Sequence, residues 1–289
     1  TGVQTCALPI CERMSNSHYD LIIEPGRGIS HYWRDLWQYR ELFYFLAWRD
    51  ILVRYKQTAI GVAWSVLRPF LTMVVFTLLI QQAGKTPSEG VPYPVLVYAA
   101  MLPWQFFANT FTDSSNSLID NQNLLTKVYF PRIIVPASSV IVALVDFAIS
   151  VVILAGLMLW YGFMPDWRII FLPLFLLQAL LFAFGAGLWV SALNVQYRDF
   201  RYVVPFLVQF GLYVSPVGFS SSIVPEQWRL LYALNPMVGV IDGFRWAITG
   251  RENLIYWPGY LLSLTLIFCI LAGGFLWFRR MERNFAGVV

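Results

Sequence analysis

The sequence predicts an all-α integral membrane protein with six transmembrane helices, and three observations favour this fold class. Of the 289 residues, 58% are hydrophobic and only 12% are charged, whereas an ordinary soluble domain has about 25% charged residues. Apolar runs of about 20 residues, the length that crosses a bilayer, recur along the chain. Runs such as residues 133–160 are apolar on every side, whereas strands of a membrane barrel alternate apolar and polar side chains.

The N-terminal region precedes the first span. The chain begins without methionine, and residues 1–13 resemble no signal peptide, so we expect a non-native leader with Met14 as the natural start. Residues 31–49 repeat apolar and aromatic side chains at three- and four-residue spacing, which predicts an amphipathic helix too polar to span. Its aromatic rings suit the headgroup zone, and a surface helix packed on protein is the alternative. Residues 14–59 then form a cytoplasmic N-terminal region.

Residues 60–278 form the expected transmembrane domain. We expect its six spans at about residues 60–83, 94–111, 133–161, 168–194, 203–219 and 257–278. The fifth span is marginal because it is short and contains prolines. A polar tail at residues 112–123 cannot lie in lipid and must face water or protein. Gly185 and Gly187 permit close contact between helices.

The segment between the fifth and last spans, residues 220–257, is broken repeatedly by proline, glycine and charged residues. It predicts a re-entrant or interfacial pair of short helices. Basic residues near the span ends gather on one side of the predicted topology. They are Arg49, Arg54, Lys56, Lys127, Arg132, Arg198, Arg201, Arg279, Arg280 and Arg283. Both termini, including the tail at residues 279–289, are therefore expected in the cytoplasm.

Composition and motifs argue against several other classes of protein. The net charge is +4, but the basic residues flank apolar runs, which fits membrane orientation better than nucleic-acid binding. Cys6, Cys11 and Cys269 lack the spacing of a metal site or disulfide framework. A partial phosphate-loop match at residues 84–86 has Leu79 where its first glycine should stand. We therefore expect no catalytic centre, metal or cofactor on this chain.

Asp146 is the one acid deep in an apolar run, where a charge costs several kcal/mol unless it is paired. A proton-coupled transporter would use such an acid, whereas a packing contact with a neighbouring polar group is the structural alternative. Aromatic residues near the expected outer face can stack on sugar rings, although interface belts and ordinary packing explain them equally well. With Asp146, the candidate channel or glycan contacts are Trp104, Phe106, Phe107, Tyr213 and Trp246.

Several motifs together resemble the permease family of ABC-2 polysaccharide exporters, which export O-antigen, capsule or teichoic acid. In chain order they are Arg49-Asp50-Ile51 with Lys56, Gly61 with Trp64 and Pro69, residues 128–132, Tyr197-Arg198-Asp199 with Val204-Pro205, Ser215-Pro216, Asn235-Pro236-Met237, and Gly243-Phe244-Arg245. The resemblance covers residues 30–282, and the set of motifs is more specific than any one of them.

The resemblance implies a homodimer of six-span subunits, each bound to a separate ABC ATPase that carries ATP and Mg. Residues 31–48 would be the cytoplasmic interface helix, residues 121–132 the coupling helix, residues 197–201 a second ATPase contact, and residues 220–250 a gate at the outer mouth. The residues carried over for coupling are Leu124, Leu125, Lys127, Tyr129, Phe130, Arg132, Arg198, Asp199 and Arg201. The expected activity is export of a lipid-linked polysaccharide across the bacterial inner membrane, among membrane lipids.

Three other functions stay open on the sequence alone. An ABC exporter of a small molecule or lipid shares the six spans and the interface helices. A secondary transporter needs an ion or proton relay, for which the sequence offers Asp146 alone. A membrane-embedded sugar or lipid transferase needs a catalytic centre. Co-purification with a stoichiometric ATPase would separate the exporter from the last two classes.

Overall fold

The computed structural model describes residues 36–56, 67, 69–78, 91–128, 130–197, 199–250 and 255–282. Every element within these residues is a helix, which confirms the predicted all-α fold class. The chain divides into residues 1–38, of which only the helical residues 36–38 are described, and a compact unit that begins at Tyr39. Much of the first predicted span lies outside the described residues. The helices discussed below all belong to the unit that begins at Tyr39.

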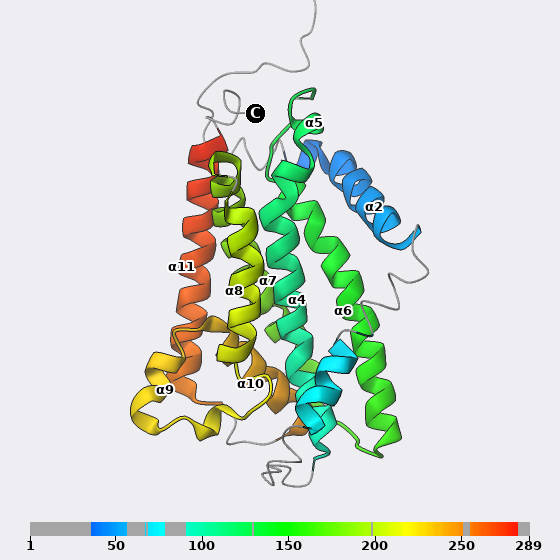
Figure 1. Cartoon of the computed structure of the whole chain (residues 1–289), viewed down its shortest axis with the longest axis vertical. Coiled ribbons are helices and arrows are strands. Elements are labelled where there is room, and N and C mark those ends of the chain that lie inside the picture. Colours follow the sequence, from blue (N-terminus) through cyan, green and yellow to red (C-terminus); the bar gives the residue numbers. More distant parts are fainter. Residues whose placement is uncertain are drawn as a thin grey trace, which may run out of the picture. The chain divides into compact units, whose positions relative to one another are not determined.

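Within the described residues, three helices are long and apolar enough to cross a membrane: α6 (Ile134–Trp160), the continuous helix Trp167–Gln196 and α11 (Trp257–Glu282). The second of these joins a 3-10 turn, η2 (Trp167–Phe171), to α7 (Leu172–Gln196). They confirm the third, fourth and last predicted spans. Two shorter apolar helices, Pro69–Leu78 and α8 (Phe200–Val214), lie within the first and at the fifth predicted spans. Figure 1 shows the long helices running side by side.

A further long helix, α4 (Tyr93–Asp120), packs against α6, α7, α8 and α10 (Pro236–Thr249). The helix continues through the polar tail to Asp120, beyond residue 111 where the second predicted span ends. The tail faces protein, as Ser114, Ser115 and Ser117 are buried between helices. Lipid offers no hydrogen-bond partners to these serine side chains, so contact with protein allows the polar part of the helix to remain inside the bundle.

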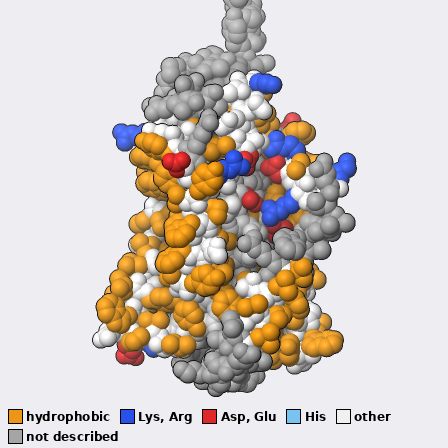
Figure 2. Space-filling view, in the orientation of Figure 1, with side chains coloured by type: hydrophobic (Ala, Val, Ile, Leu, Met, Phe, Trp, Pro, Cys, Tyr) orange, Lys and Arg blue, Asp and Glu red, His pale blue; other side chains and the backbone are white. Residues whose placement is uncertain are grey.

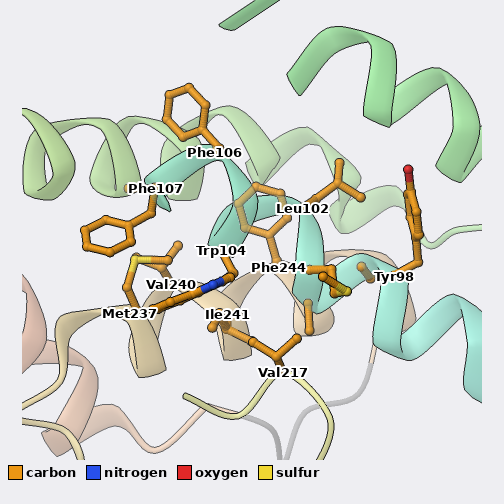
Figure 3. Packing of buried hydrophobic residues seen from close by; sticks show 14 of the residues in the cluster. Tyr98, Leu102, Trp104, Phe106, Phe107, Val217, Met237, Val240, Ile241 and Phe244 are labelled. Atoms are coloured by element: carbon orange, nitrogen blue, oxygen red, sulfur yellow. The ribbon is translucent and has the colours of Figure 1, made fainter. Parts of the chain in front are cut away.

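A pair of short helices, α9 (Glu226–Tyr232) and α10, follows α8 and confirms the predicted broken segment. Asn235 begins α10 by accepting a hydrogen bond from the Met237 backbone N–H at 3.1 Å. Gly250 ends the helix in the left-handed conformation, with φ of 71°. α10 then packs inside the bundle, where Ile241 and Phe244 lie against Leu102 and neighbouring residues of α4 (Figure 3).

Two predicted helix ends differ from the structure. α2 (Arg40–Lys56) continues past Arg49, where the amphipathic helix was expected to end. α8 ends at Val214, five residues before the end of the fifth predicted span. Pro216 explains this end, because a proline forces the preceding residue out of the helical conformation, and Ser215 has an extended ψ of 150°.

Glycines allow α7 and α11 to approach closely. A Cβ added to Gly185 would lie 2.7 Å from the Leu271 Cα, and one added to Gly274 would lie 2.4 Å from the Gly185 carbonyl oxygen. A Cβ on Gly187 would lie 2.6 Å from the Ser114 Oγ of α4. Backbone atoms are the obstacle at the first two positions, so no side chain can move aside. The prediction of close helix contact at Gly185 and Gly187 is confirmed.

Gly185→Ala is expected to destabilise the bundle by about 1–3 kcal/mol, the usual cost of overpacking a tight contact. Thermal unfolding of the purified protein in detergent measures the effect. Gly156→Ala is the matched control, because its added Cβ meets no atom within 4 Å and alanine is the better helix former. An equal or smaller loss in Gly185→Ala than in the control would show that the contact is not tight.

Candidate functional site

A short turn at one end of the bundle links α4 to α6. It consists of α5 (Gln122–Leu125) and the residues that lead to Pro131, so the helix is shorter than the predicted residues 121–132. Leu124 and Leu125 are half-buried, while Lys127 and Val128 are exposed. Apolar and basic side chains are therefore presented outside the bundle.

The base of the same turn is anchored to the bundle. The Phe130 side chain is only 4% exposed. The Arg132 backbone N–H donates to Glu282 Oε1 at 2.8 Å, and the Arg132 guanidinium donates to the Glu282 carbonyl oxygen at 3.3 Å. Arg132 therefore contacts the last helix and Phe130 is buried, whereas Tyr129 lies outside the described residues.

The second predicted contact lies at the same end of the bundle. Asp199 and Arg201 are exposed at the start of α8. Arg201 Nη2 is 4.0 Å from Asp120 Oδ1, at the end of α4. Such an exposed ion pair contributes about 0–1 kcal/mol to stability. It therefore shows that the two residues are close, but it stabilises the fold little. The structure thus brings the two predicted coupling segments together, although Arg198 itself lies outside the described residues.

A polar cluster joins α2 to α4 and α6. The Arg54 guanidinium lies between two carboxylates, with Nη1 3.0 Å from Asp113 Oδ2 and Nη2 2.9 Å from Asp146 Oδ2. The Tyr55 hydroxyl donates to Asp146 Oδ1 at 2.5 Å, and the Asn109 amide donates to Asp146 Oδ2 at 3.4 Å. We call these five residues the α2 cluster. It gives the buried Asp146 partners on two other helices.

Charged side chains gather toward this end of the bundle, while the sides below are mostly hydrophobic (Figure 2). Arg49 extends the polar contacts of α2 by donating to Asn121 Oδ1 at 2.6 Å. α2 exposes aromatic rings, including Tyr44 and Trp48, while its residues Leu46 and Ala47 are buried. One helix therefore carries both exposed aromatic rings and polar contacts to the bundle.

The aromatic candidates fall into two groups. Trp104, Phe106 and Phe107 are buried in the core, where Phe107 stacks on Phe182 of α7 with ring centroids 4.8 Å apart (Figure 3). Trp246 is half-buried, and the Arg168 guanidinium carbon lies 5.2 Å from its ring centroid.

Tyr213, in contrast, is exposed on α8. It belongs to a stripe of exposed rings, which we call the α8 stripe and which consists of Tyr202, Phe206, Phe210 and Tyr213. Phe206 and Phe210 stack with centroids 6.1 Å apart. Their spacing places them on one face of the helix. The sequence analysis singled out only Tyr213, although aromatic residues at three- and four-residue spacing were a signal for the whole stripe.

A buried charged pair on α10 was also missed as a pair. Arg245 donates to the carbonyl oxygens of Val217 and Phe219 at 2.8 and 2.6 Å, and thereby fixes the segment after α8. Asp242 lies one turn earlier on the same helix and is 6% exposed. An acid and a base three residues apart in an apolar helix were the available signal.

Among the described residues, no group of three His, Cys, Asp or Glu side chains is placed to hold a metal ion.

Comparison with known proteins identifies the family. The model of the ABC-2 type transporter family matches residues 41–249. The O-antigen export system permease protein RfbA of Myxococcus xanthus is 30% identical over 73% of this chain and 82% of that protein. A Klebsiella pneumoniae protein of the same description is 25% identical over 83% and 92% of the two chains. The polysialic acid transport protein KpsM of Escherichia coli is 24% identical over 74% and 80%. The chain belongs to the ABC-2 type transporter family.

Proposed function

We propose that this chain is the membrane permease subunit of an ABC exporter that moves a lipid-linked polysaccharide across the bacterial inner membrane. In this proposal ATP and Mg bind to a separate ATPase subunit, as membership of the ABC-2 type transporter family suggests. The names of its relatives, which export O-antigen or transport polysialic acid, support a polysaccharide substrate. The exposed turn at α5 is the observation that carries the proposal, since an ATPase on another chain needs a surface on which to act.

In this proposal the turn receives the ATPase through Lys127 and Val128, with Leu124 and Leu125 behind them. Asp199 and Arg201 add a second contact at the same end. Phe130 and Arg132 have a different role, because Phe130 is buried and Arg132 ties the turn to Glu282 of α11. A displacement of Lys127 and Val128 by the ATPase is then transmitted to the bundle, because the base of the turn is fixed to it.

α4 is the element suited to carry the movement across the membrane. It follows directly into α5 at one end, and its 28 residues span about 42 Å at the helical rise of 1.5 Å per residue. Its buried residues pack against α10. Through Arg245, α10 also holds the segment after α8. Displacement of the turn therefore reaches the short helix pair, which we assign to the gate at the outer mouth.

The polysaccharide path lies along α8, between two copies of this chain. The α8 stripe leaves four aromatic rings exposed on the described subunit. Aromatic faces pack well on the apolar CH faces of sugar rings, and facing stripes from two subunits would line one passage. A homodimer also covers an apolar face that one subunit leaves open. The basic residues near α5 support assigning this end, and both termini, to the cytoplasm in this proposal.

The coupling assignment predicts that Lys127→Glu combined with Val128→Asp weakens association with the ATPase at least about tenfold, or ~1.4 kcal/mol. Both side chains are exposed, so the bundle should remain folded. Co-purification in nanodiscs with ATPases encoded in the same genome, followed by titration, measures the affinity. Arg280→Glu is the matched control, because it reverses an exposed charge on α11, near the same end, without touching the turn.

Equal affinity for wild type and the double variant would contradict the coupling assignment. Failure of wild-type protein to bind any ATPase would contradict the ABC exporter as a whole and favour a secondary transporter or membrane enzyme. Stimulation of a stable complex by a small molecule or lipid, and not by lipid-linked glycan, would contradict the polysaccharide substrate.

The path assignment predicts that Phe206→Ala combined with Phe210→Ala lowers glycan export severalfold without weakening ATPase binding. Each substitution removes one ring on which a sugar can stack. The stacking of a nucleic-acid base on an aromatic side chain, at about 1–3 kcal/mol, gives the scale of the loss. Export is measured as surface glycan in cells, with the amount of complex determined in parallel. Phe268→Ala, at an exposed ring of α11, is the control. Equal export by the double variant and the control would place the path elsewhere.

A further inference from the structure

A cavity of about 480 Å³ lies between α9, α10, the short 3-10 helix η3 (Ser221–Ile223) and the beginning of α11. Its volume falls within the roughly 300–1,000 Å³ typical of small-molecule sites. The side chains that carry the argument are Asp242, Arg229, Tyr232, Tyr256, Trp257 and Tyr260. The cavity lies at the end of α11 opposite the α5 turn, since Glu282 at the other end of α11 contacts Arg132 (Figure 1).

Asp242 is the feature of this cavity that most needs a partner. Its side chain is almost fully buried, and its Oδ1 atom has no hydrogen-bond partner within the described part of the chain. Burial raises the pKa of Asp242 to about 6, while a hydrogen bond from Ser221 and the charge of Arg245 act in the opposite direction. A buried acceptor without a partner is unfavourable. A ligand that donates a hydrogen bond to this carboxylate would relieve that cost.

The other polar groups of the cavity are held in place by the protein. Arg229 Nε donates to the Val224 carbonyl oxygen at 3.1 Å, and Nη2 donates to that of Ser222 at 3.4 Å. The Tyr260 hydroxyl accepts a hydrogen bond from the Gln178 amide at 2.5 Å. These contacts fix a guanidinium and a phenol on the cavity wall, so little rotamer freedom is left to lose on binding.

Aromatic rings complete the cavity. Trp257 is 61% exposed, and its ring stands edge-on to Tyr260 at 87°, with centroids 6.0 Å apart. Tyr256 beside it is also exposed. An exposed tryptophan next to a buried carboxylate and a fixed guanidinium offers one apolar face together with hydrogen-bond acceptors and donors. Amphipathic ligands with a flat apolar face and several hydroxyl groups match this combination.

We propose that this cavity binds one neutral hexose-sized unit of a saccharide, with ring hydroxyls donating to Asp242 and accepting from Arg229 while the CH face lies on Trp257. The inference rests on the proposed export of a polysaccharide and adds a sugar site beside the short helix pair, apart from the α8 stripe. An anionic ligand is disfavoured by the Asp242 carboxylate, and a cation is disfavoured by Arg229 and the nearby Arg245. A neutral polyhydroxylated ring is repelled by neither charge, and its hydroxyl groups can donate to Asp242 and accept from Arg229.

The test is saturation-transfer NMR on the full-length protein in nanodiscs, with D-mannose, D-galactose, L-rhamnose and N-acetyl-D-glucosamine as probes and glycerol 1-phosphate as the anionic comparison. Wild type is expected to bind at least one sugar saturably. Trp257→Ala and the cavity-filling rim variant Ser222→Trp should each weaken that binding at least about tenfold. Trp228→Ala, which removes an exposed tryptophan of α9 that does not line the cavity, should leave it unchanged.

Saturable binding of none of the sugars, equal binding by all variants, or preference for glycerol 1-phosphate would each overturn the sugar site. Export of glycan by the wild-type complex is measured in parallel to separate the two proposals. Export without the expected binding pattern refutes the cavity alone. The expected binding pattern in a complex that exports no glycan refutes the proposed function and leaves the sugar site standing.

Discussion

A polar side chain inside an apolar bundle must find its partner within the protein, since lipid offers none. Asp146 shows how this constraint shapes the molecule: it lies in the middle of α6 and is paired with Arg54 and Tyr55 of α2. Arg54 in turn reaches Asp113 of α4. These contacts hold α2 against α4 and α6. The helix expected at the membrane surface is thereby fixed to the membrane domain.

The same constraint explains features elsewhere in the bundle. The polar tail of α4 remains helical because α7 covers it, and the Asn194 amide of α7 donates to the Ser115 carbonyl oxygen at 3.0 Å. Arg245 uses its guanidinium to hold loop carbonyls that would otherwise lack donors. Polar contacts thus connect α2, α4 and α10 to their neighbours, while glycines bring α7 and α11 together. A bundle linked in this way can transmit a displacement from the α5 turn to the short helix pair.

Much of this architecture could be predicted from local sequence. Length and hydropathy located α6, α7 and α11, and the frequent prolines and glycines predicted the short pair α9 and α10. Predictions failed where a distant partner decides the outcome. Nothing near residue 111 indicates that Gly187 and Asn194 of another helix will cover the serines that follow, so the sequence did not show that α4 continues through them.

Site residues show the same limit. The sequence indicated that Asp146 needs a partner but could not name Arg54, which lies 92 positions earlier. The family resemblance carried over Lys127 and Phe130 together as coupling residues, yet Lys127 is exposed and Phe130 is buried. The sequence pattern also does not show whether an aromatic ring such as Phe107 or Tyr213 packs within its own subunit or is left exposed for a partner or substrate. Burial in the folded chain separates the two cases.

The claim that the Arg54–Asp146 pair fixes α2 to the bundle is tested most directly by a double-mutant cycle with Arg54→Gln, Asp146→Asn and the combination. Unfolding of the purified protein in detergent gives the three changes in stability. The account predicts that the two single losses do not add, with a coupling energy of about 1–3 kcal/mol, while the exposed pair Arg201 and Asp120 shows well under 1 kcal/mol. Losses that add within about 0.5 kcal/mol would contradict it.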